Sequence, residues 1–122
     1  MMQDLKKILM KTAERVLAAI GLTEDSIKRY RPYDPSVRYT SRQLEPYDAL
    51  SDRFVRSVEM CFLFFRIFER HAFGDVSETY RDNLNPMEKL GAIRSADLWL
   101  EMRHIQNRPC RTPLIPWRRR LA

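Results

Sequence analysis

The sequence predicts an all-α fold, an antiparallel bundle of four to five helices, and three observations support this. Apolar residues recur at intervals of three and four residues along several segments, as on one face of a helix. No segment alternates polar and apolar residues like a half-buried strand, and no Asn-Gly or Asp-Gly pair marks a hairpin. The three glycines, Gly21, Gly74 and Gly91, each follow such a periodic stretch, where glycine commonly ends a helix.

The first helix is expected over residues 2–20. Its apolar stripe consists of Leu5, Ile8, Leu9, Ala13, Val16, Leu17 and Ile20. After Gly21, Thr23 is expected to cap a short helical turn over residues 24–30. Two prolines then block helix continuation, so residues 31–41 are predicted to form a loop.

A long helix is expected to begin at Glu45 or Pro46, because proline fits the first helical turn, and to continue to about residue 71. Its stripe consists of Tyr47, Leu50, Phe54, Val58, Cys61, Phe65, Phe68 and Ala72. Between residues 60 and 68 the helix is apolar around nearly its whole circumference, which indicates burial on all sides. We therefore expect an interface with a second chain here, in a homodimer or a hetero-oligomer, and the candidate dimer-interface residues are Phe62, Phe64, Phe65 and Phe68. Alternatively, other helices of the same chain cover these side chains.

Three shorter helices are expected after the long one. The first covers residues 75–83, and the second starts at Asn85 and Pro86, where Glu88 completes a capping box, and ends at Gly91. Ser95 is expected to cap the last helix, which runs to about residue 107. Its inner face is predicted to consist of Leu98, Met102 and Ile105, with Trp99 beside Met102.

The net charge of +6 is unevenly distributed, which divides the chain into two parts. Residues 1–107 form the predicted helical domain and are nearly neutral, whereas residues 108–122 form a proline-rich tail with five arginines and no acidic residue. These tail arginines are candidates for binding nucleic-acid phosphates: Arg108, Arg111, Arg118, Arg119 and Arg120. Alternatively, the tail is simply a solvated, disordered end.

Composition argues against several classes of protein. Two cysteines and two histidines do not cluster as a zinc site requires, and three scattered glycines cannot form a phosphate-binding loop, so we expect no metal and no cofactor. The most apolar run, residues 60–68, contains Arg66 and is far shorter than the roughly 20 residues that span a bilayer. With no signal peptide evident, we expect a cytoplasmic protein that does not bind membranes.

The polar face of the last helix is the best candidate for chemistry. Arg103 and Asn107 are four residues apart and share a helical face, and His104 is adjacent. An arginine with a polar partner can hold a phosphodiester, and an imidazole can move a proton. The alternative is a solvent-exposed polar face with a structural arginine.

Several segments, in order and spacing, resemble the HEPN family, closest to nucleotidyltransferase substrate-binding proteins or HepT-like toxins. These segments are residues 47–50, 52–54, 81–84, 87–93, 95–99 and 102–103. The resemblance implies a dimeric antiparallel helical bundle, metal-independent ribonuclease activity, and a minimal nucleotidyltransferase as antitoxin partner.

The family's ribonuclease motif is an arginine, often followed by asparagine, with a histidine further downstream. Here Gln106 occupies the arginine position, Asn107 matches, and Arg111 stands where the histidine is expected. The resemblance therefore implies a toxin–antitoxin component with impaired ribonuclease activity, in which Arg103 and Asn107 contact RNA and His104 is a substitute proton carrier. The alternatives are a non-catalytic helical oligomerisation or binding module and a small basic nucleic-acid-binding protein.

Overall fold

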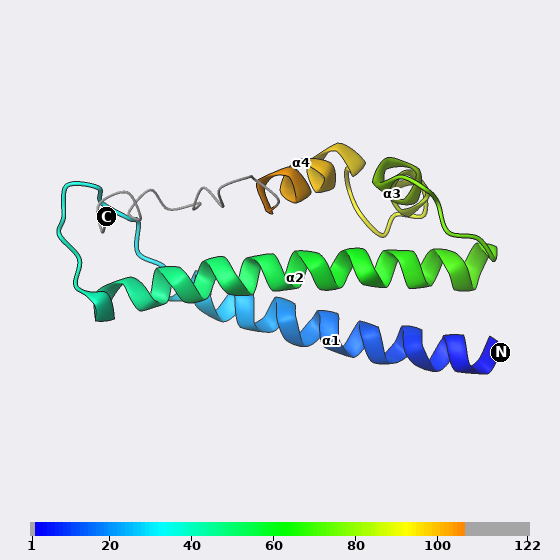
Figure 1. Cartoon of the computed structure of the whole chain (residues 1–122), viewed down its shortest axis with the longest axis horizontal. Coiled ribbons are helices and arrows are strands. Elements are labelled where there is room, and N and C mark those ends of the chain that lie inside the picture. The colour runs from blue at the N-terminus through cyan, green and yellow to red at the C-terminus, as the bar shows by residue number, and fades with distance from the viewer. Residues whose placement is uncertain (1, 107–122) are drawn as a thin grey trace.

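The computed structural model describes residues 2–106 of the 122-residue chain, and this part contains four helices and no strand. They are α1 (Met2–Lys28), α2 (Ser41–Phe73), α3 (Tyr80–Lys89) and α4 (Ala96–Gln106). The helices α1 and α2 form a long antiparallel hairpin, and α3 and α4 pack on the side of α2 opposite α1 (Figure 1). The prediction of an all-α fold is confirmed, and α2 is the central element. The predicted domain boundary after residue 107 lies outside the described residues.

The first helix does not end at Gly21, contrary to the prediction, but continues to Lys28. Thr23 is not a cap, because it is buried against α2, where its Oγ1 lies 3.0 Å from both the Ala19 and the Arg53 carbonyl oxygens. Arg53 in turn donates from Nη1 to the Ser26 hydroxyl at 2.9 Å. These contacts with α2 stabilise the additional turns of α1 as a helix. This stabilisation exceeds the local tendency of glycine to end a helix.

The long helix begins at Ser41, four to five residues before the predicted start. Thr40 and Gln43 form a capping box in which the Gln43 amide donates to Thr40 Oγ1 at 3.2 Å and the Thr40 amide donates to Gln43 Oε1 at 2.8 Å. Pro46 consequently lies inside the helix, beyond its first turn. The helix ends at Gly74, which has a left-handed φ of 79°, as the sequence predicts.

The two short helices expected over residues 75–83 and from residue 85 onward are also incorrect, because a single helix, α3, runs through Pro86. Thr79 caps it by accepting from the Asp82 amide at 3.1 Å. Glu88 forms no capping box at its own helix start and instead accepts from the Ala96 amide at 2.9 Å, at the beginning of α4. The predicted end near Gly91 is confirmed, since this glycine has a φ of 80°.

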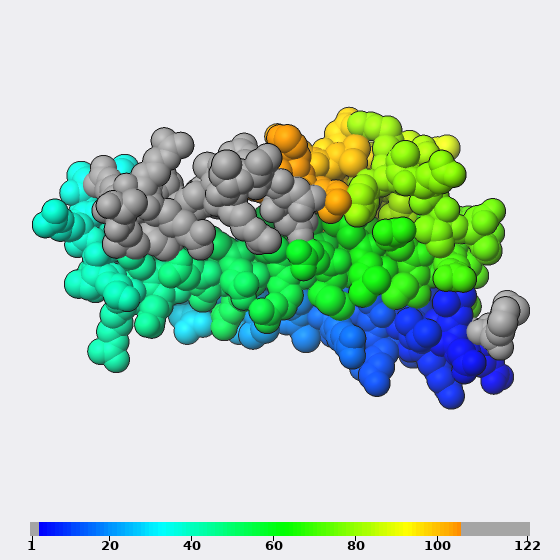
Figure 2. All heavy atoms as spheres, in the orientation of Figure 1, coloured from blue at the N-terminus to red at the C-terminus, as the bar shows by residue number. Residues whose placement is uncertain are grey.

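The main core lies between α2 and the two short helices. Its buried members are Val58, Cys61, Phe62, Phe65, Leu84, Met87, Ile93 and Ala96, and Val16 and Ile20 of α1 pack against them. A second, smaller cluster near the start of α2 contains Leu44 and Tyr47, with Tyr33 and Tyr39 packed against it. The space-filling view shows α3 and α4 covering only part of the length of α2 (Figure 2).

Four apolar residues assigned to apolar stripes or inner faces are instead exposed, namely Ile8, Leu17, Ala72 and Leu98. Leu17 and Ile8 of α1 are 70% and 52% exposed, because α1 packs against α2 along one narrow face that includes the small residues Thr12 and Ala19. In α4, Leu98 is 51% exposed, and Trp99 and Leu100 pack against the core in its place. The start of α4 agrees with the prediction, since Ser95 Oγ accepts from the Leu98 amide at 3.2 Å. None of the described helices is long and apolar enough to cross a membrane.

Candidate functional site

Arg103, the arginine proposed to act on RNA, lies on the face of α4 that turns toward an aromatic cluster. Its guanidinium carbon is 3.7 Å from the centroid of the Tyr80 ring and 5.8 Å from that of Phe62. The side chain is half-buried. Stacking of a guanidinium on a tyrosine face is a cation–π contact. It orients the arginine side chain, and the ring attracts its positive charge.

The contact depends on how α3 and α4 are joined. Tyr80 is the first residue of α3, and its ring lies edge-to-face against Phe62 of α2 at 5.3 Å. The next residue, Arg81, forms an ion pair with Asp97 in the first turn of α4 at 3.1 Å. The start of α3 is therefore tied both to α2 and to α4, which holds the Tyr80 ring beneath Arg103.

Two of the three predicted catalytic residues, Arg103 and His104, lie in the described part of the chain, and their environments differ. His104 is exposed, whereas Arg103 turns toward the rings of Tyr80 and Phe62. Adjacent helical residues point about 100° apart, so the imidazole and the guanidinium do not converge on one point. Asn107 and the tail arginines (Arg108, Arg111, Arg118, Arg119 and Arg120) lie outside the described residues.

The four phenylalanines predicted to form a dimer interface have two different environments. Phe62 and Phe65 are 5% and 7% exposed, and both lie edge-to-face against Trp99 of α4, at 5.8 and 5.1 Å. Phe64 and Phe68 are half-buried, and their rings stack at 6.3 Å. Helices of the same chain thus account for the burial of Phe62 and Phe65, as in the alternative interpretation. The homodimer itself stays a prediction.

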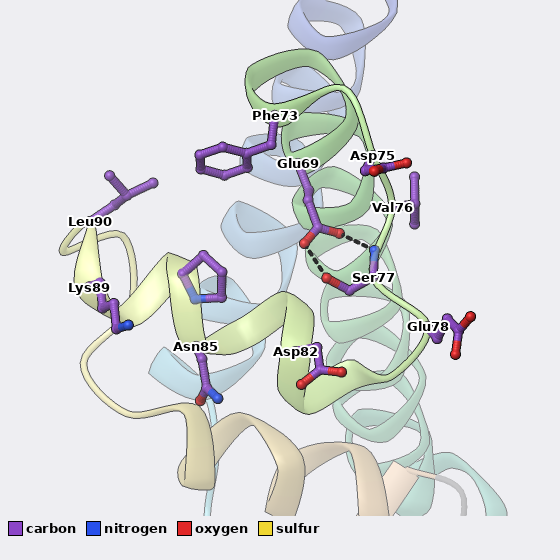
Figure 3. A pocket seen from close by; sticks show the side chains of 11 residues that line it. Glu69, Phe73, Asp75, Val76, Ser77, Glu78, Asp82, Asn85, Lys89 and Leu90 are labelled. Carbon is purple, nitrogen blue, oxygen red and sulfur yellow. Dashed lines mark hydrogen bonds between the residues drawn. The ribbon is translucent and has the colours of Figure 1, made fainter.

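A second candidate region is an open cavity of about 890 Å³ between the end of α2, the segment over residues 74–79, and α3 (Figure 3). Glu69 lies at its base, only 5% exposed, and its carboxylate accepts from the Ser77 amide at 2.8 Å and from the Ser77 hydroxyl. The Asn83 side-chain amide donates to the same carboxylate at 3.3 Å and to the Phe65 carbonyl at 3.2 Å.

The hydrogen bonds of Glu69 are directed at its own chain, so its role in this structure is to fasten residues 74–79 and α3 to α2. Three further carboxylates line the cavity, those of Asp75, Glu78 and Asp82, together with Lys89. Across residues 2–106 no three His, Cys, Asp or Glu side chains are placed to hold a metal ion. Glu69 could not be identified from the sequence, because its partners are eight and 14 residues away and follow no local motif.

The described cysteine is not a nucleophile at neutral pH. Cys61 is buried in the main core, and burial raises the pKa of its thiol to about 11. A thiol with such a pKa is almost entirely protonated and unreactive in the cell.

Comparisons of the chain with models of protein families, with curated proteins and with solved structures gave no match. Function must therefore be inferred from the placement of the residues described above. Of these residues, Arg103 has the most distinctive environment.

Proposed function

We propose that this protein is a HEPN-like helical component of a toxin–antitoxin pair, that it binds a minimal nucleotidyltransferase, and that its ribonuclease activity is impaired. The observation that supports the impairment is that Arg103 turns toward the ring of Tyr80, at 3.7 Å, whereas the adjacent His104 is exposed to solvent. An arginine that stabilises a phosphodiester must direct its N–H groups at the phosphate oxygens. A ring stacked on the face of the guanidinium orients these in-plane N–H groups without itself occupying them, so the impairment is attributed to proton transfer and not to the stack.

Proton transfer is the requirement that these residues meet poorly. A general acid or base must come within hydrogen-bond reach of the atom it serves, about 2.6–3.2 Å. His104 is exposed and diverges from Arg103 around the helix, so the two side chains do not address one phosphodiester. The protein therefore acts chiefly by binding.

The segments that resemble the HEPN family contribute strongly to the core. Leu84 and Met87 are 0% and 1% exposed, and Ile93 and Ala96 are also buried. These residues lie in three of the six resembling segments, which pack α3 and the start of α4 against α2. The resemblance thus bears more directly on the fold than on catalysis.

A cleavage assay on the full chain, with single-stranded RNA and without metal, tests the ribonuclease part of the proposal. The wild-type chain and Arg103→Ala are expected to leave the RNA intact, and so is the control Arg94→Ala, which changes an exposed arginine before α4. Cleavage by the wild-type chain that only Arg103→Ala abolishes would contradict the impairment.

Co-expression tests the partner. A minimal nucleotidyltransferase encoded beside this protein's gene is expected to co-elute with the full chain in size-exclusion chromatography. Separate elution of the two proteins, or the absence of such a neighbouring gene, argues against a toxin–antitoxin pair.

A second candidate, a non-catalytic oligomerisation module, is favoured by exposed apolar side chains on α1. Met10 and Leu17 are 60% and 70% exposed and, being seven residues apart, lie on the same face of the helix. Light scattering that gives a dimeric mass without any nucleotidyltransferase favours this candidate. The third candidate, binding of nucleic acid through residues 108–122, lies outside the described residues and fails if binding survives truncation after residue 107.

A further inference from the structure

The cavity between the end of α2, residues 74–79 and α3 has exposed apolar side chains in its lining (Figure 3). It is called the α2–α3 cavity below. Phe73 and Leu90 are 56% and 59% exposed, and Val76 is 37% exposed. Large apolar side chains that gather at one concave place on a surface are typical of a site that binds another segment of protein.

The same cavity is acidic. Three exposed carboxylates line it, those of Asp75, Glu78 and Asp82, and Lys89 is the single basic residue among its described lining residues. None of the three carboxylates is in an ion pair within residues 2–106. A segment that fits this cavity must therefore combine apolar side chains with positive charge.

The wall that carries these carboxylates is already fixed in place. Glu69, at the base of the cavity, accepts from the Ser77 amide at 2.8 Å and from the Asn83 side chain at 3.3 Å. These bonds fasten the segment before α3, and the first turns of α3, to α2. The carboxylate of Glu69 is thus engaged with its own chain, and only the three exposed carboxylates remain to attract a basic segment.

Residues 114–120 of this chain have the required composition, and they lie outside the described residues. The segment contains three large apolar residues followed by three arginines, and no acidic residue: Leu114, Ile115, Trp117, Arg118, Arg119 and Arg120. The number of arginines equals the number of exposed carboxylates at the cavity. The apolar residues and the charges are therefore complementary to the cavity in kind and in sign.

The chain after α4 is long enough to reach the cavity. Arg103 contacts Phe62, and Glu69 follows Phe62 by seven residues on α2, which is about 10 Å along the helix axis. Gln106, the last residue of α4, comes one helical turn after Arg103. An extended chain spans about 3.3 Å per residue, so the eight residues from Gln106 to Leu114 span about 26 Å. This length exceeds the distance along α2 and leaves residues for a turn.

We propose that residues 114–120 bind in the α2–α3 cavity of the same molecule, with their apolar side chains against Phe73 and Val76 and their guanidinium groups at the three exposed carboxylates. Guanidinium groups form paired, charge-assisted hydrogen bonds with carboxylates. The large apolar surface of Trp117 adds burial against the exposed side chains of the cavity. A docked segment has its arginines engaged, so they are withdrawn from other anions.

The proposal is independent of the proposed toxin–antitoxin function, because it involves neither a second protein nor RNA. Paramagnetic relaxation measured by NMR on the full chain tests it directly. In the variant Cys110→Ser/Ala122→Cys, a thiol-reactive nitroxide attaches at residue 122, two residues after Arg120. The native Cys61 stays unlabelled, because it is buried in the main core and burial raises the pKa of its thiol to about 11.

The amide signals of Val76 and Leu90, beside the cavity, are expected to lose at least half of their intensity when the nitroxide is present. The Leu44 signal is expected to stay unchanged, because Leu44 precedes Phe73 by about 43 Å along α2. A mixture of labelled chain without isotope enrichment and enriched chain without label is expected to show no loss. Such a result assigns the contact to a single molecule.

Two variants remove the complementary charges from either side. Asp75→Asn/Glu78→Gln/Asp82→Asn neutralises the exposed carboxylates of the cavity and is expected to restore most of the lost intensity. Replacing the three consecutive arginines of residues 118–120 with alanine is expected to have the same effect. This second variant changes no residue of the described helices, so it tests the charges without altering the core.

The matched control makes the same chemical change at three exposed carboxylates outside the cavity, in the variant Asp25→Asn/Asp48→Asn/Glu59→Gln. It is expected to leave the loss of intensity unchanged. The proposal is overturned if the cavity signals keep their intensity in the labelled chain, or if the cavity variant and its control restore them equally. It is also overturned if the mixture shows the full loss, which would assign the cavity to the same segment of a second copy.

Discussion

Replacing Arg103 with alanine is expected to lower the free energy of unfolding by about 2 kcal/mol. A partly desolvated cation–π contact such as that between Arg103 and Tyr80, at 3.7 Å, contributes about 1 kcal/mol. The half-buried aliphatic stem of the arginine contributes about 1 kcal/mol more through packing. In a domain of this size the change lowers the melting temperature by roughly 8 °C or somewhat more.

A double-mutant cycle separates the ring contact from the packing term. Urea unfolding is followed by circular dichroism for the wild-type chain, Arg103→Ala, Tyr80→Leu and the double variant. The coupling free energy is expected to be about 1 kcal/mol, since only the cation–π contact requires both partners. Arg56→Ala is the matched control, because its ion pair with Asp52 is exposed, lies within α2, and is expected to contribute less than about 0.5 kcal/mol.

Additive effects, within about 0.3 kcal/mol, would refute the structural role of Arg103. Arg103 would then not be oriented by Tyr80, and the contact at 3.7 Å would contribute nothing measurable to the stability of the domain. The double-mutant cycle measures the contribution of Arg103 to stability, and the RNA-cleavage assay measures its contribution to activity.

Two further predictions concern the main core. Leu84→Ala is expected to lower the free energy of unfolding by about 3–4 kcal/mol, because the side chain is fully buried. The control Leu90→Ala changes a side chain that is 59% exposed and is expected to lower it by less than about 0.5 kcal/mol. Equal losses for the two variants in urea unfolding would contradict the assigned core. With the thiol pKa of Cys61 at about 11 instead of 9.0, its thiolate is about a hundredfold scarcer near pH 8. In a Cys110→Ser chain, a disulfide reagent is therefore expected to modify the native protein at least about a hundredfold more slowly than the urea-unfolded protein, and equal rates would contradict the burial.

Features that depend on neighbouring residues were predictable from the sequence. The all-α class follows from helical periodicity, the start of α4 from Ser95, and the ends of α2 and α3 from Gly74 and Gly91. In each case the deciding interaction lies within four residues, as in the bond from the Leu98 amide to Ser95. Such local rules act independently of how the helices pack.

Gly21, Pro46 and Pro86 were misjudged because each was interpreted locally as a helix boundary. All three lie inside helices. Glycine and proline each destabilise a helix interior, and other interactions compensate for this loss of stability. For α1 these are the contacts of Thr23 with α2, and for the two prolines a threonine cap lies further upstream, at Thr40 and at Thr79. A capping residue and a proline each predict a helix start, at different positions, and the sequence alone does not show which of the two positions begins the helix.

The sites were harder to predict than the helices, because their contacts join distant residues. Arg103 was identified as notable, but Tyr80, 23 residues earlier, gave no indication that it would lie beneath the guanidinium. The tyrosines near the start of α2 follow no regular spacing, since Tyr33 and Tyr39 come from the connection between α1 and α2, whereas Tyr47 comes from α2 itself. Only the path of residues 29–40 back toward α2 brings these rings together.

The burial of Phe62 and Phe65 narrows the surface through which a second protein can bind. Because Trp99 covers both rings, only Phe64 and Phe68 of the predicted interface remain partly exposed. The outer face of α2 carries the exposed Asp52–Arg56 ion pair, which favours contact with water over apolar docking. A partner that buries apolar surface therefore has more to gain on α1, where Met10 and Leu17 are exposed. A dimer built on the phenylalanines must bury Phe64 and Phe68, whereas one built on α1 leaves them unchanged.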